Sequence, residues 1–184
     1  MHSDVVKNWF ENDFCDLDPL LQKLHLSGGE LSGRVDISYG KGISGLIGQR
    51  LAKKLKLPDQ GTHDLLVSIT HSDQGLHWNR KFNDANTVES IFVPFGNKKN
   101  GYWIETTGPM KMKLTVDIVD GGWFWKCLNV SFLGLPIPLF LIPKSQAYKI
   151  IENDKYVFNV SFSYPLFGSL VSYKGALDAS YFEQ

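Results

Sequence analysis

Arg80 and Glu105 are the residues in this sequence that best suit recognition of a charged group. Arg80 lies between Trp78 and Phe82 at a spacing of two, so in a strand all three side chains point to one face. An interior guanidinium needs an anionic partner because an unpaired buried charge is costly. Glu105 in a nearby expected strand is the candidate partner. The pair either fixes strand register or contacts a ligand anion, unless the Arg80 head group reaches the rim.

Aromatic residues near this pair predict the walls of a cavity. Trp78, Trp103 and Tyr173 are the expected wall residues, with Arg80 and Glu105 as the polar anchor of the ligand-binding site. No nucleophile elbow, HExxH helix or P-loop accompanies them, so no catalytic residue is assigned. Glu105 as an acid or base remains the alternative, because acid-base chemistry in a dry pocket needs no sequence signature.

Histidines and cysteines give no metal or disulfide pattern. His71 and His77 are close in sequence, but the alternation expected of a hairpin places them on different faces. Cys15 and Cys127 are far apart and form neither a CxxC nor a Cys/His ligand pattern. We therefore expect no metal, no cofactor and a cytoplasmic location.

A GxGxxG motif begins at Gly40, after an expected strand and before an expected helix. Asp64 follows it by about twenty residues, as in dinucleotide-binding folds. Such folds need parallel strands joined by repeated helices, and the sequence after Gly61 has no second helical pattern. A flexible strand-to-helix turn is the favoured interpretation, with anion binding by Lys41 and the helix N-terminus as the alternative.

Composition predicts a single domain, residues 1–184, with material for one core. Nineteen basic and nineteen acidic residues give no net charge, which argues against a nucleic-acid partner. Short amphipathic helices are expected at 16–26 and at about 45–57, the second capped by Ser44.

The rest of the chain predicts an antiparallel meander. A strand is expected at 30–39, and a hairpin around residues 72–75 places Ile69 opposite Trp78. Further strands are expected at 88–95, 102–107, 110–118, 123–132, 146–151, 156–163 and 170–177. The fold class is α+β, mainly antiparallel β: a strongly curved meander sheet or barrel of about nine or ten strands, with one or two short helices near the N-terminus.

The apolar stretch 132–143 contains three prolines. It is shorter than the roughly 20 residues that cross a bilayer, so it is expected to form a loop. This loop either folds over the core, forms a hydrophobic lip that admits a lipid-like ligand, or rests on a membrane or protein partner.

Several short motifs occur in an order that resembles a known family. They are Trp78-Asn79-Arg80-Lys81-Phe82, Glu105-Thr106-Thr107-Gly108-Pro109, Gly134-Leu135-Pro136-Ile137-Pro138, Pro165-Leu166-Phe167-Gly168 and Tyr173-Lys174-Gly175. In this order the chain, from the Leu20 helix to Leu177, resembles an uncharacterised bacterial domain family. Its members are found alone, after saccharopine-dehydrogenase-like modules, or at the C-terminus of YndJ-type membrane proteins.

The resemblance carries no activity, but it implies a membrane-protein or dehydrogenase-like partner and a membrane-adjacent position. Three functions follow from the sequence. The first is a non-catalytic module that holds a hydrophobic or amphipathic small molecule inside the sheet or barrel. The second is an accessory or catalytic domain of an oxidoreductase-type system. The third is a structural module that docks on a membrane or protein through residues 132–140.

Overall fold

The computed structural model describes residues 5–73, 75–83 and 86–182. The helical segments are α1 (Val5–Phe10), the 3-10 helix η1 (Glu11–Asp16), α2 (Pro19–Ser27), α3 (Ile43–Lys54) and the 3-10 helix η2 (Leu139–Leu141). The strands are β1 (Gly29–Tyr39), β2 (Gly61–Ser72), β3 (Gly75–Phe82), β4 (Asn86–Phe95), β5 (Tyr102–Thr107), β6 (Met110–Val119), β7 (Gly122–Phe132), β8 (Leu135–Ile137), β9 (Lys144–Glu152), β10 (Lys155–Tyr164) and β11 (Gly168–Tyr181). None of the described helices is long and apolar enough to cross a membrane.

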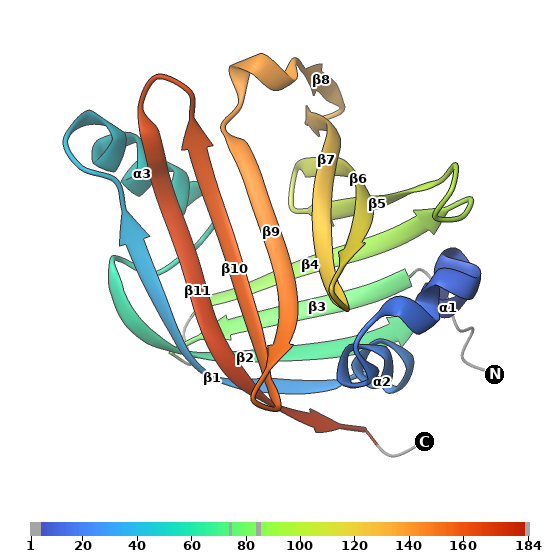
Figure 1. Ribbon diagram of the computed structural model, residues 1–184. Helices are drawn as coiled ribbons and strands as arrows, with labels where there is room; N and C mark the ends of the chain where they lie inside the picture. Colours follow the sequence, from blue (N-terminus) through green and yellow to red (C-terminus); the bar gives the residue numbers. More distant parts are fainter. Residues whose placement is uncertain (1–4, 74, 84–85, 183–184) are drawn as a thin grey trace.

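The strands form a closed antiparallel barrel of ten strands, and β8 is an extra strand on the edge of β7 (Figure 1). Neighbours in sequence are neighbours in the sheet, except where β7 pairs with β9. The long pairing of β1 with β11 and the pairing of β6 with β7 complete the ring. In the closed ring every strand pairs with a neighbour on each of its two sides. The structure therefore confirms the predicted fold class and decides between a curved sheet and a barrel.

Alternation of apolar and polar side chains explains which face of each strand turns inward. Ile69 on β2 lies opposite Trp78 on β3, as predicted. The inward residues Leu65, Val67 and Ile69 are almost fully buried. Gln74, in the turn between these strands, lies outside the described residues.

One end of the barrel, here called the helical end, is closed by α1, η1 and α2 (Figure 1). Helix α2 begins at Pro19 because Asp18 caps it, accepting a hydrogen bond from the Leu20 amide at 2.8 Å. The helix expected at 16–26 thus begins three residues later, at Pro19, and Asp16 is the last residue of η1. Helices α1 and η1 were not predicted; they bury Trp9 and Phe10.

The glycine motif packs α3 against β11. A Cβ atom on Gly40 or Gly48 would collide with the carbonyl oxygen of Ser169 or Leu170. Gly42, with a φ of 58°, is the N-cap of α3, which runs over Ile43–Lys54 instead of the expected 45–57. Ser44 was predicted as the cap, but its hydroxyl donates to the Lys41 carbonyl oxygen at 2.7 Å. An antiparallel barrel is incompatible with the parallel sheet of a dinucleotide-binding fold.

Candidate functional site

The barrel encloses a cavity of about 300 Å³. Its wall is mainly apolar and comes from nearly every strand, with α3 and the segment 137–143 adding the side chains of Leu51, Leu55 and Ile142. Among the described lining residues, α1, η1 and α2 contribute none. The cavity therefore lies towards the end opposite these helices. We call this end the mouth end; it is formed by α3, the loop 133–143 and the turn between β10 and β11 (Figure 1).

Arg80 reaches the cavity from β3 and is held by hydroxyl groups. Its Nη1 donates to the Tyr173 hydroxyl at 3.4 Å, and its Nη2 donates to the Ser90 hydroxyl. The Ser90 hydroxyl shares a hydrogen bond of 2.6 Å with that of Thr107, which donates to Glu105 Oε1 at 3.2 Å. Within the described residues no carboxylate forms an ion pair with the guanidinium. Glu105 is thus coupled to Arg80 through two hydroxyls, instead of directly as expected.

Two hydrogen-bond donors of the described wall residues have no partner. Arg80 Nε and Trp78 Nε1 are both buried, and neither has an acceptor among the described residues. Burial raises the pKa of the Tyr173 hydroxyl, although the charge of Arg80 opposes the shift, so Tyr173 stays protonated and does not act as an anion. A bound group that supplies acceptor oxygens would satisfy these donors.

Four of the five predicted site residues meet at this cavity: Trp78, Arg80, Glu105 and Tyr173. Trp103 is fully buried elsewhere. Its ring packs against Trp9 and Trp123, at centroid distances of 5.5 and 6.4 Å, in the aromatic cluster beneath the helical end.

Lys149 on β9 is a polar wall residue that the sequence reasoning missed. Only 3% of it is exposed. Its Nζ lies 2.7 Å from His25 Nε2, and 3.9 and 4.5 Å from the ring centroids of Trp123 and Trp78. Alternation could have found it, since it lies opposite the inward residue Phe158 in the β9–β10 pairing.

The environment of Lys149 disfavours its charge. Burial lowers the pKa of Lys149 well below its usual range. Burial, followed by the nearby charge of Lys149, lowers the pKa of His25 in the same direction. His25 is therefore neutral, and its Nε2 shares a hydrogen bond with the amine. Within the described part of the chain no carboxylate pairs with Lys149, and the facing indole rings supply the remaining attraction for a cation.

His71 and His77 take part in other contacts. His71 Nε2 lies 2.9 Å from the His25 carbonyl oxygen, and His77 Nδ1 lies 3.3 Å from Glu89 Oε1. Over the residues that the structure describes, no group of three or more His, Cys, Asp or Glu side chains could hold a metal ion.

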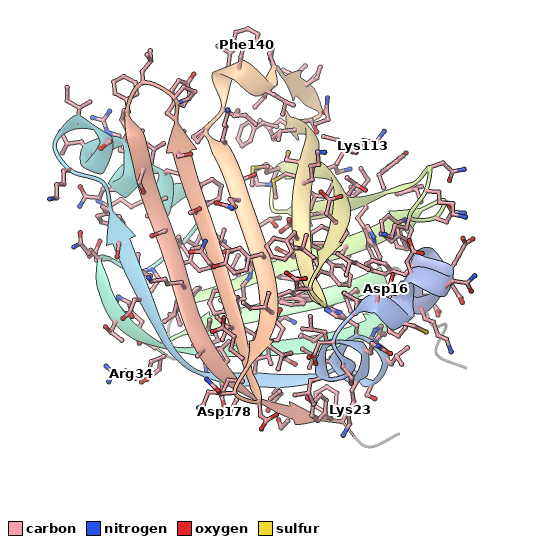
Figure 2. All side chains as sticks on the ribbon, in the orientation of Figure 1. Asp16, Lys23, Arg34, Lys113, Phe140 and Asp178 are labelled. Atoms are coloured by element: carbon pink, nitrogen blue, oxygen red, sulfur yellow. The ribbon has the colours of Figure 1, made fainter. Side chains whose placement is uncertain are left out.

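The loop at 132–143 contributes to the cavity wall but also presents large apolar side chains to solvent. Ile142 and Pro143 line the cavity. Leu133, Leu135 and Phe140 are each more than 70% exposed. Figure 2 shows Phe140 on the outermost loop of the mouth end.

The fold and this cavity define an up-and-down β-barrel, the architecture that encloses small ligands when its interior is not filled by side chains. The chain belongs to the DUF4166 family, a domain of unknown function, whose family model matches residues 17–177. No curated protein and no solved structure matches the chain significantly.

Proposed function

We propose that the barrel is a non-catalytic binding module for an amphipathic small molecule whose acidic head group is held by Arg80. The observation that carries the proposal is the guanidinium of Arg80 on the wall of a mainly apolar cavity, where two hydroxyl groups and, within the described residues, no carboxylate hold it. Arg80 Nε and Trp78 Nε1 are buried without acceptors, so a ligand whose oxygen atoms reached them would remove the cost of leaving them unpaired.

The apolar part of the ligand would occupy the rest of the cavity. A volume of about 300 Å³ is within the range of small-molecule sites. Apolar side chains such as Leu114, Phe158 and Met112 make up most of its wall. Burial of a hydrocarbon chain against them contributes roughly 0.8 kcal/mol for each CH₂ group.

The charges on the wall favour an anion over a cation or a neutral head group. Arg80 is permanently charged, and Lys149 becomes a better cation when an anion is near. Glu105 is the single acid among the described wall residues, and it accepts a hydrogen bond from Thr107. A carboxylate or phosphate head group would therefore meet Arg80 and an amine, Lys149, that it would help to protonate, against a single acid.

Calorimetric titration with dodecanoate and with dodecanol tests this function. We expect wild-type protein to bind dodecanoate more tightly than dodecanol. Arg80→Met should weaken dodecanoate binding about tenfold or more, because charge-assisted hydrogen bonds are lost, and leave dodecanol binding unchanged. Arg34→Met, at an exposed arginine on the outside of the barrel, is the matched control (Figure 2). Equal affinity of the wild type for both probes, or no binding of either, would contradict the proposal.

Unfolding measurements separate a binding role of Arg80 and Lys149 from a structural one. Lys149→Met should raise the free energy of unfolding by about 1 kcal/mol or more, because it removes a buried amine that lacks a carboxylate partner. The same change should weaken dodecanoate binding. Strong destabilisation by Arg80→Met or Lys149→Met would instead assign that residue to the structural framework.

Docking through residues 132–140 is the second candidate function, and the exposure of Leu133 and Phe140 favours it. An accessory role in an oxidoreductase-type system, a dehydrogenase-like partner and a cytoplasmic location are inferences from family resemblance and cysteine usage. The Thr107 hydrogen bond to Glu105 gives this acid a partner and does not favour a role in acid-base catalysis.

A further inference from the structure

Large apolar side chains are exposed around the mouth end of the barrel. They come from three separate segments: α3, the loop after β7 and the turn between β10 and β11. Phe140 is 77% exposed and Leu166 is 86% exposed. We call the whole set the mouth collar; its members are Ile43, Leu46, Leu133, Leu135, Leu139, Phe140, Leu141, Leu166 and Phe167.

The three segments are joined in space. The Tyr164 hydroxyl, at the end of β10, donates to the Phe140 carbonyl oxygen at 2.7 Å. On the other side, the Gly40 amide donates to the Leu170 carbonyl oxygen at 2.9 Å and so ties the start of α3 to β11. The collar is therefore one surface and not three unrelated loops.

The charge around this surface has one sign. Residues 40–57, 132–145 and 163–169 contain no Asp or Glu. Their basic residues, all exposed, are Lys41, Arg50, Lys53, Lys54, Lys56 and Lys144. The chain as a whole has equal numbers of acidic and basic residues, so this concentration is local.

We propose that the mouth collar docks on an anionic lipid bilayer. Leu and Phe side chains that project from a surface rich in Lys and Arg match the two layers of a bilayer interface, which are the acyl boundary and the anionic head groups. The docking proposal is supported by the collar alone and does not depend on the ligand proposed for the barrel. The further step, in which the membrane supplies or receives the ligand of the barrel, rests on the proposed function.

Charge also decides between a membrane and a second copy of this chain. Two collars placed face to face would bring two basic surfaces together, and like charges oppose that contact. An anionic bilayer removes the repulsion and attracts each lysine or arginine near its surface. The inner sides of the same segments line the cavity, through Leu51 on α3 and Ile142 after η2. Docking would thus place the cavity wall next to the lipid.

Co-sedimentation with vesicles tests the docking. We expect wild-type protein to sediment with phosphatidylcholine vesicles that contain phosphatidylserine, and much less with phosphatidylcholine alone. The double variant Phe140→Ser/Leu166→Ser should bind the anionic vesicles about tenfold more weakly or worse, because both apolar tips are lost. Lys53→Glu/Lys54→Glu should have a similar effect, which added salt should mimic in the wild type.

Matched changes away from the collar are the controls. Val119→Ser removes an exposed apolar side chain from the end of β6, and Lys126→Glu reverses an exposed charge on β7. Both should bind vesicles like the wild type. Failure of the wild type to bind anionic vesicles, or equal losses in the control variants, would overturn the proposal.

Two more results separate docking from ligand binding and from self-association. The Arg80→Met variant should still sediment with anionic vesicles. If this variant loses dodecanoate binding but still sediments, the change affects the ligand site in the barrel and not the docking surface. Concentration-dependent dimers in solution that Phe140→Ser/Leu166→Ser abolishes, without vesicle binding, would assign the collar to a second copy and overturn the membrane proposal.

Discussion

At the scale of single residues, two hydroxyl groups, from Tyr173 and Ser90, hold the guanidinium of Arg80 inside the barrel. Strand alternation between Trp78 and Phe82 was enough to predict that the Arg80 side chain points to the inner face of the sheet, where it lines the cavity. The Arg80 partner Tyr173 was not predictable, because β11 is remote from β3 in the sequence and does not neighbour it in the sheet. The other partner, Ser90, lies on the neighbouring strand β4, opposite Trp78. Hydroxyls are weaker partners than a carboxylate, and they leave the guanidinium charge less neutralised for a ligand.

Lys149 and His25 were missed for a different reason. Nothing in the sequence near either residue indicates that they touch, since one lies on β9 and the other on α2. A lysine in a strand is usually exposed, and only the inward register of β9 makes this one an exception.

The buried His25 gives an acid-dependent stability. Its pKa is well below 6.5 in the folded protein, mainly through burial, while in the unfolded chain it is about 6.5. Below about pH 6.5 the unfolded chain therefore binds a proton that the folded protein does not. The free energy of unfolding should fall as the pH drops, by at most about 1.4 kcal/mol per pH unit. Burial also lowers the pKa of Lys149, so the free energy of unfolding should fall with decreasing pH in the alkaline range as well.

Urea denaturation of His25→Gln between neutral and mildly acidic pH checks this dependence. The free energy of unfolding of the variant should depend less steeply on pH, because the contribution of His25 is lost. This holds whatever the absolute stability of the variant. A wild-type slope in His25→Gln would show that other groups cause the acid sensitivity.

At the scale of elements, the glycine motif shows how one pattern serves different purposes. Its spacing matches a phosphate-binding turn, yet Gly40 and Gly48 allow α3 to approach the backbone of β11. Nucleotide binding and close packing both require a missing side chain, so spacing alone could not decide between them. The antiparallel strands that follow made packing the better interpretation.

Gly48→Ala should disrupt this contact. The added methyl group would collide with the Leu170 carbonyl oxygen, which is backbone and cannot rotate away. We expect a loss of roughly 1–3 kcal/mol in the free energy of unfolding, measured by urea denaturation, although alanine is otherwise the better helix former. Gln49→Ala, at the next and exposed position, should cost little. A Gly48→Ala variant as stable as the wild type would show that α3 shifts freely.

At the scale of the whole molecule, the sequence predicted the number of strands and their order but not the closure of the ring. Hairpin order follows from local turns, such as that between β2 and β3. Closure depends on Gly29 pairing with Tyr181 and Tyr39 with Val171, which are distant in the chain and carry no local signal. The exposed collar was equally unpredictable, because an apolar loop can fold inward or outward.

Closure makes β11 indispensable. Deletion of residues 168–184 would leave β1 and β10 each with one unpaired edge and remove Leu170, Val171 and Leu177 from the core. We expect the shortened chain to lose its cooperative urea transition and its near-ultraviolet circular dichroism. Replacement of residues 134–137, which contain β8, by a Gly-Ser linker of equal length should preserve both, since β8 lies outside the ring. Cooperative folding without β11 would contradict an all-or-none barrel.

The aromatic cluster has an optical consequence. Trp103 packs against Trp9, and Trp123 packs against both Trp103 and Trp125, with centroid distances of 5.1 to 6.4 Å. Excitation absorbed by any of these indoles can migrate to its neighbours at such distances. Trp125 and Trp78 face the cavity. The intrinsic tryptophan fluorescence of the protein therefore depends on the surroundings of these two rings. A molecule that entered the cavity would change this fluorescence, so its binding could be measured without an attached dye.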